Sequence, residues 1–185
     1  VAYPHLSNNP INTLISICKR LNDKKLDKGN KNFQPSNLEF TAINVDNKAH
    51  NVIPARAIAQ FNIRYNNLHT ASSLRKKINL IVRNVSRKNK CKSTIEFIEN
   101  GDAFLTKPES TIFMAKNIIK KITKLTPKLS TTGGTSDARF IRKIAPCLEF
   151  GLVNKTMHKV DECVSIADLK KLTEIYKSIL QENFK

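Results

Sequence analysis

The feature that most limits how this chain can fold is a pair of alternating apolar and polar segments between two amphipathic helical segments. Residues 38–45 and 57–65 alternate with a period of two, which is typical of half-buried strands. Residues 10–21 and 71–87 instead repeat their apolar side chains at helical spacing. Residues 93–98 indicate a third strand. The order helix, strand, strand, helix, strand is that of a ferredoxin-like (split βαβ) unit without its first strand.

The second half of the chain has a different order of patterns. Helical periodicity covers 109–125 and 166–180, and the short apolar stretch 146–150 indicates a strand. These strands are too few for an independent α/β domain. A turn signal at Asn100-Gly101-Asp102 marks the expected boundary. We therefore predict two incomplete domains, cut from a longer chain: 1–99 and 100–185.

The formal net charge of +17 raises the question of nucleic-acid binding. The Lys and Arg residues are spread along the whole chain, however, and no stretch interleaves them with aromatic residues. Compositional bias is therefore favoured over nucleic-acid binding. A basic chain would still attract a small polyanionic substrate.

Nothing in the sequence indicates a membrane span or a secretion signal, because it has no long apolar run and no signal-peptide pattern. The cysteines are widely spaced and form no C-x-x-C pair, so we expect buried, reduced thiols and a cytoplasmic protein. They are Cys18, Cys91, Cys147 and Cys163.

Residues 130–164 hold the strongest candidate site. Gly133-Gly134 allows a close backbone approach before a short helix, whose start would favour an anion. His158 follows the expected strand 146–150 and is either a metal ligand or a surface histidine. One histidine cannot hold zinc alone, because catalytic zinc sites use three protein ligands.

Three further residues are open to two interpretations. Arg64 lies on the polar face of the second alternating segment and either faces solvent or clamps a carboxylate. Asn51 is a turn residue or a ligand contact, and Tyr3 belongs to the core or to the rim of a site.

Several motifs in register carry a resemblance that spans the whole chain. They are VAYPHLSNNPI, LDKGN, NVIP, FNIRY, FLTKP, TTGGTSDARFI and EFGLVNKTMHKVDECV. With these motifs the chain resembles the second half of the bacterial succinyl-diaminopimelate desuccinylases, di-zinc hydrolases of the aminoacylase and carboxypeptidase type.

The resemblance implies a fold, a reaction and partners. Residues 1–99 would be most of the dimerisation (lid) domain, and residues 100–185 the C-terminal portion of the catalytic α/β domain. The complete enzyme would be a homodimer with two zinc ions per active site, for which cobalt can substitute. It would hydrolyse N-succinyl-LL-2,6-diaminopimelate to succinate and LL-2,6-diaminopimelate, a step of lysine and peptidoglycan synthesis. It would bind neither nucleic acid nor a membrane.

The resemblance also implies roles for single residues. His158 matches the last zinc ligand, while the other ligands, the general-base glutamate and an oxyanion-stabilising histidine match no residue of this chain. No catalytic residue is therefore expected here. Tyr3 and Asn51 would serve the partner subunit's active site. The positions that match substrate contacts are Tyr3, Asn51, Arg64, Gly134, Thr135 and Asn154.

This sequence departs from the family pattern at four positions. Ala138 replaces a usual Gly, Leu152 a Pro, His50 an Asn and Asp161 an Asn. Two other functions remain open: a dimerisation module or truncated pseudoenzyme without chemistry, and a deacylase similar to acetylornithine deacetylase.

Overall fold

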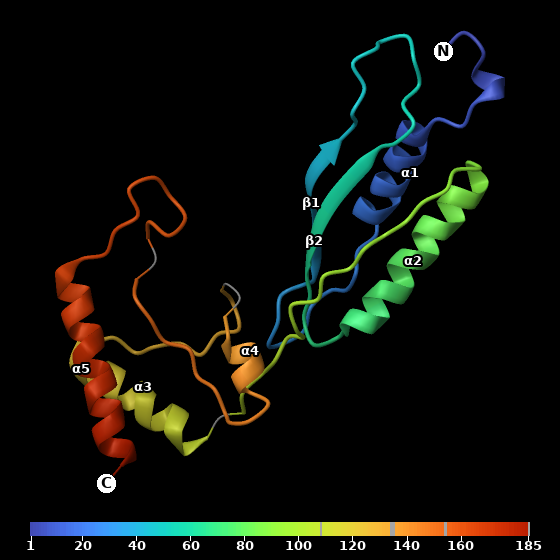
Figure 1. Cartoon of the computed structure of the whole chain (residues 1–185). Helices are drawn as coiled ribbons and strands as arrows, with labels where there is room; N and C mark the ends of the chain where they lie inside the picture. Colours follow the sequence, from blue (N-terminus) through green and yellow to red (C-terminus); the bar gives the residue numbers. More distant parts are fainter. Residues whose placement is uncertain (108, 134–135, 154, 185) are drawn as a thin grey trace. The chain divides into compact units, whose positions relative to one another are not determined.

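The chain forms two compact units, Val1–Phe104 (unit 1) and Leu105–Lys185 (unit 2). The computed structural model describes residues 1–107, 109–133, 136–153 and 155–184 (Figure 1). None of the helices in these ranges is long and apolar enough to cross a membrane. The predicted domain assignment, 1–99 and 100–185, stays a prediction.

Unit 1 is a two-stranded antiparallel sheet with two helices on one face (Figure 1). A short 3-10 helix, η1 (Pro4–Leu6), is followed by α1 (Pro10–Asn22), β1 (Asn37–Asn44), β2 (Ile58–Arg64) and α2 (Ala71–Lys88). The predicted α-β-β-α order is therefore confirmed for these four elements. The pairing runs from Asn37↔Arg64 at one end to Asn44↔Ile58 at the other, with an irregularity between Phe40 and Ala42.

Local signals explain where both helices begin. The Asn9 side chain accepts a hydrogen bond from the Ile11 amide at 2.9 Å, and Pro10 occupies the first turn of α1. Thr70 and Ser73 form a reciprocal capping box at the start of α2. Six basic residues and no acidic one lie within α2, all of them on its exposed side: Arg75, Lys76, Lys77, Arg83, Arg87 and Lys88.

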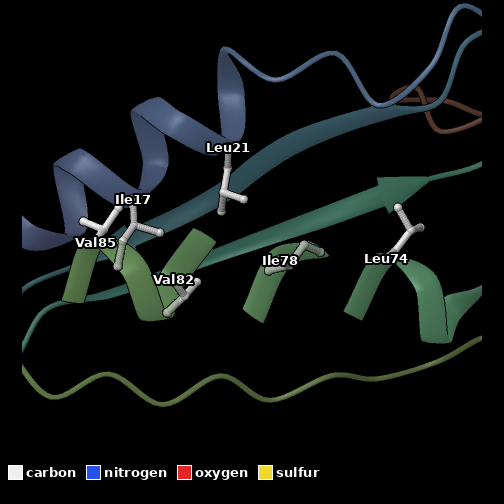
Figure 2. Close-up of a cluster of buried hydrophobic side chains, with 6 residues drawn as sticks. All are labelled: Ile17, Leu21, Leu74, Ile78, Val82 and Val85. Carbon is white, nitrogen blue, oxygen red and sulfur yellow. The ribbon is translucent and has the colours of Figure 1, made fainter. Parts of the chain in front are cut away.

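The core of unit 1 lies between α1 and α2 and against the inner face of the sheet. Leu38, Phe40, Phe61 and Ile63 of the strands pack against it from the sheet. Its buried members, shown in Figure 2, are Ile17, Leu21, Leu74, Ile78, Val82 and Val85.

The predicted strand at 93–98 is wrong as a paired strand. Ile95 and Phe97 are half-buried and pack on the core cluster, as the alternation of the segment requires. None of the described residues forms a ladder with it, however, and a strand is defined by that ladder. In the split βαβ arrangement its neighbour would be a strand before the first helix, and the described residues that precede α1 form no strand.

The described part of unit 2 contains three helices: α3 (Ser110–Thr123), α4 (Ala138–Ile141) and α5 (Ile166–Asn183). Its small buried core lies between α3 and α5 and consists of Ile112, Ala115, Ile119 and Ile175. The predicted strand at 146–150 is wrong as well, because no described segment pairs with it. Thr106 Oγ1 donates to the Cys147 carbonyl at 2.6 Å, and the Tyr176 hydroxyl donates to the Phe150 carbonyl.

Candidate functional site

The segments that carry Tyr3 and Asn51 lie at the same end of unit 1. The Val1 amine contacts the Asn51 carbonyl at 3.5 Å, and a shallow hollow is lined by residues of the N-terminal segment and of the loop 45–54. Tyr3 is 69% exposed, with its ring edge-on to His5 at 6.4 Å between centroids. Both predicted contact residues are therefore solvent-accessible in this chain.

Arg64 lies at the opposite end of the sheet. It is the last residue of β2 and is paired with Asn37, while the loop 45–54 follows the other end of β1 (Figure 1). A seven-residue strand spans about 20 Å. Arg64 is thus not brought together with Tyr3 and Asn51 within unit 1.

His158 is presented by a tight exposed loop in unit 2. Thr156 Oγ1 closes this loop by donating to the Cys163 carbonyl at 2.8 Å and accepting from the Cys163 amide at 3.0 Å. The His158 amide donates to Glu162 Oε2 at 3.3 Å. His158 and Asp161 have φ of 62° and 59°, a left-handed conformation that Asp and Asn adopt more readily than most residues. The replacement of the family's Asn by Asp161 is therefore compatible with this backbone.

Three of the predicted contact residues, Gly134, Thr135 and Asn154, lie outside the described residues. Nearby, the Ala138 amide donates to Ser136 Oγ at 3.1 Å, and Ser136 is hydrogen-bonded to Glu149. The described part of unit 2 holds no group of three or more His, Cys, Asp or Glu placed to bind a metal ion. His158 can thus supply one ligand, but these residues do not form a complete metal centre.

The sequence interpretation did not find a buried polar cluster around Asp27. The side chains of Asp27 and His69 are only 8% and 6% exposed, and His69 Nε2 lies 3.1 Å from Asp27 Oδ2. Asp27 Oδ1 accepts from the Gly29 amide at 2.6 Å and from Asn66 Nδ2 at 2.8 Å. The Ser36 amide donates to both carboxylate oxygens, at 3.3 and 3.2 Å.

Gly29 fits this cluster because of its backbone. Its φ is +73°, and a Cβ atom there would come within 2.6 Å of the Phe33 carbonyl oxygen. The motif LDKGN contained a local signal for this turn, since an Asp two residues before a Gly often accepts a hydrogen bond from its amide. The partners Asn66 and His69 had no such signal.

The Asp27 cluster should make unit 1 sensitive to acid. Burial alone would raise the pKa of Asp27, but hydrogen bonds from Ser36, Gly29 and Asn66 outweigh it and hold the pKa well below its ordinary value. The ordinary Asp pKa is about 3.9, so below that pH the unfolded chain binds more protons than the folded one. The stabilisation by Asp27 is complete above about pH 4 and is lost as the pH falls further.

Urea unfolding between about pH 2.5 and 6, followed for the native chain and for Asp27→Asn, measures this effect. We expect the native chain to lose stability more steeply than the variant on acidification. If the unfolding free energies of the two proteins fall in parallel as the pH is lowered, the proposed role of Asp27 in acid sensitivity is contradicted.

A second polar contact holds the end of unit 1. The Tyr65 hydroxyl donates to Asp102 Oδ1 at 2.8 Å, and the same oxygen accepts from the Ala71 amide at 3.3 Å. Burial raises the pKa of Tyr65, and the negative charge of Asp102 raises it further, so the phenol stays protonated. This contact fixes the chain just before Phe104.

The fold of unit 1 is that of a known domain class. Residues 1–90 match the family model described as the peptidase dimerisation domain. The structure of aminopeptidase PepT from Bacillus cereus has a similar fold, with a TM-score of 0.78 and 16% identity, over 99% of this chain and 48% of that one.

Within this class, the chain is similar to proteins named succinyl-diaminopimelate desuccinylase. It is 60% identical to the one from Pelagibacter ubique over 100% of this chain and 48% of the relative. Identity to the relative from Rhodopseudomonas palustris (strain BisB5) is 48%, with the same coverage. The relative from Rickettsia bellii (strain RML369-C) is 46% identical over 98% of this chain and 46% of its own. The resemblance found in the motifs is thereby confirmed, and the chain spans about half the length of these relatives.

Proposed function

We propose that this chain forms the C-terminal half of a zinc-dependent amidohydrolase that converts N-succinyl-LL-2,6-diaminopimelate to succinate and LL-2,6-diaminopimelate. The observation that carries this proposal is the 60% identity to a desuccinylase along the entire chain. Enzymes of this reaction act in lysine and peptidoglycan synthesis, so a cytoplasmic location goes with the proposal.

In this proposal His158 contributes one zinc ligand, and the remaining ligands come from residues outside this chain. The exposure of the loop around His158 supports this role, because the His158 imidazole can reach a metal held by another part of the enzyme. The bound metal would polarise the amide carbonyl and activate water. Arg64, Gly134, Thr135 and Asn154 would contact the substrate, whose carboxylates suit a guanidinium and backbone amides.

Tyr3 and Asn51 would contact the substrate bound in the partner subunit. Their separation from Arg64 by the length of the sheet supports this arrangement, since one small substrate cannot readily span both ends. The dimer would then be required for activity. The strong positive charge is assigned to attraction of an anionic substrate, not to nucleic acid.

A chimera tests the proposed function. This chain would replace the matching half of the Pelagibacter ubique relative, and hydrolysis of N-succinyl-LL-2,6-diaminopimelate would be measured with added zinc. We expect turnover by the chimera and none above the blank by the 185-residue chain alone. A folded, zinc-loaded chimera without turnover would contradict the proposal, and so would activity of the chain alone. Preference for N-acetylornithine would favour the related deacylase instead.

The oligomeric state provides a separate prediction. The dimerisation domain in residues 1–90 predicts that the chain forms a homodimer. Light scattering at several concentrations should give about twice the mass of 20.9 kDa. A monomer at every concentration would contradict this prediction.

A further inference from the structure

The Asp27 cluster lies immediately beyond the end of the sheet that carries Arg64. Asn37↔Arg64 is the last pair of the ladder, Ser36 precedes Asn37, and Asn66 follows Arg64 by two residues. The Asn66 amide donates to Ser36 Oγ at 3.0 Å. This bond extends the contact between the two strands past their last backbone pair.

One carboxylate holds both strands at this point. Asp27 accepts from the Ser36 amide before β1 and from Asn66 Nδ2 after β2. Asn66 Nδ2 also donates to the Gln34 carbonyl at 3.0 Å. Ser36 and Asn66 are 8% and 3% exposed, so water cannot readily replace these bonds if they break. The cluster therefore opposes fraying of the strand end, where local opening is otherwise easiest.

His69 connects the same carboxylate to the start of α2. It precedes Thr70, the residue that caps this helix, and its amide donates to the Asn66 carbonyl at 3.2 Å. Among the described residues, His69 is the one ionisable side chain hydrogen-bonded to Asp27. The buried Asp27 carboxylate thus connects the loop 27–36, both strand ends and the start of α2.

We propose that Asp27 is a positioning residue, which fixes the strand end at Ser36 and Asn66 and thereby the direction in which Arg64 presents its guanidinium to a substrate carboxylate. This inference rests on the substrate contact of Arg64 in the proposed function. A guanidinium binds a carboxylate through two parallel hydrogen bonds and therefore requires a defined direction. A shift of about 1 Å in a group that positions the substrate can reduce activity by about a hundredfold.

The test is a double-mutant cycle in the chimera described above. Asp27→Ala should raise KM by about 10- to 100-fold with a smaller change in kcat, because binding geometry is what it disturbs. In an Arg64→Ala background the same substitution should change KM less than about twofold, since the residue it positions is gone. An equal loss in both backgrounds would mean a purely structural role and would overturn the proposal.

Further variants keep the test informative if Asp27→Ala does not fold. Asp27→Asn retains one acceptor oxygen, and its amide can donate to His69 in the other imidazole tautomer, so KM should largely recover. Ser36→Ala removes the hydroxyl acceptor of Asn66 while leaving the carboxylate, and should raise KM severalfold. The matched control is Asp23→Ala, an exposed carboxylate paired with Lys19, which should leave KM unchanged.

Hydrogen exchange separates this inference from the proposed function. In the 185-residue chain, Ser36→Ala should speed amide exchange at 64–67 at least tenfold and leave exchange in α3 unchanged. Unchanged exchange at 64–67 would overturn the positioning role, whatever the kinetics. If exchange rises but Arg64→Ala leaves KM unaltered, Arg64 does not bind the substrate. The proposed contact then fails, and the inference about Asp27 with it.

Discussion

Leu74→Ala should lower the unfolding free energy of unit 1 by about 2–5 kcal/mol, the usual range for a buried leucine whose removal leaves a cavity. Leu74 is 3% exposed and belongs to the core cluster of Figure 2. The cluster has six buried members, each 3–8% exposed, so each member carries a large share of the burial.

Leu80→Ala is the matched control, with the same chemical change in the same helix. Leu80 is 50% exposed, and its replacement should alter stability by no more than about 0.5 kcal/mol. The measurement is urea unfolding combined with hydrogen exchange, because a chain of two units need not unfold in one step. Protection in α1 and α2 should fall for Leu74→Ala, while α3 and α5 should be unaffected. Equal destabilisation by both variants would contradict the assigned core.

His158→Ala should reduce kcat/KM of the chimera by more than about a hundredfold and weaken its zinc binding. Loss of a group that only supports a metal ligand already costs about 10–100-fold, so loss of a ligand should cost more. The neighbouring variant Lys159→Ala, on the same exposed loop, should keep both properties.

Metal content after dialysis and thermal stability would be recorded beside the kinetics. A His158→Ala chimera with full zinc content and near-normal turnover would remove this histidine from the metal site. A chimera that is inactive but fully zinc-loaded would assign His158 a role other than metal binding.

The local parts of unit 1 could be predicted from the sequence. Helical periodicity and caps such as Asn9-Pro10 indicate where α1 and α2 lie, and the alternation of apolar and polar residues indicates β1 and β2. These signals can be recognised because each lies within a few neighbouring residues. The segments 93–98 and 146–150 have equally good local patterns, yet they form no ladder with any segment that the structure describes. Strand formation depends on a partner elsewhere, and a local pattern does not specify that partner.

The candidate site also differs between features formed by neighbouring residues, which the sequence indicates, and contacts between distant residues, which it does not. Neighbouring residues alone predict that the loop of His158 and the turn at Gly133 face a ligand, and this stays a prediction. The Asp27 cluster was missed because its contacts join residues 39 and 42 positions apart in the sequence. An isolated Asp or His gives no indication of such a pairing. Only the Asp-x-Gly turn of LDKGN indicated where one partner lies.

The absence of acidic residues from α2 should set how unit 1 responds to ionic strength. Arg83 and Arg87 are one turn apart, and such like-charged pairs weaken a helix by about 0.2–0.5 kcal/mol. Dissolved salt shortens the Debye length from about 30 Å at 0.01 M to about 10 Å at 0.1 M, so this repulsion between exposed charges weakens as the salt concentration rises. Moderate salt should therefore raise the melting temperature of this chain, whereas proteins stabilised by surface ion pairs respond in the opposite direction. Buffers of low ionic strength are thus the conditions under which α2 would loosen first.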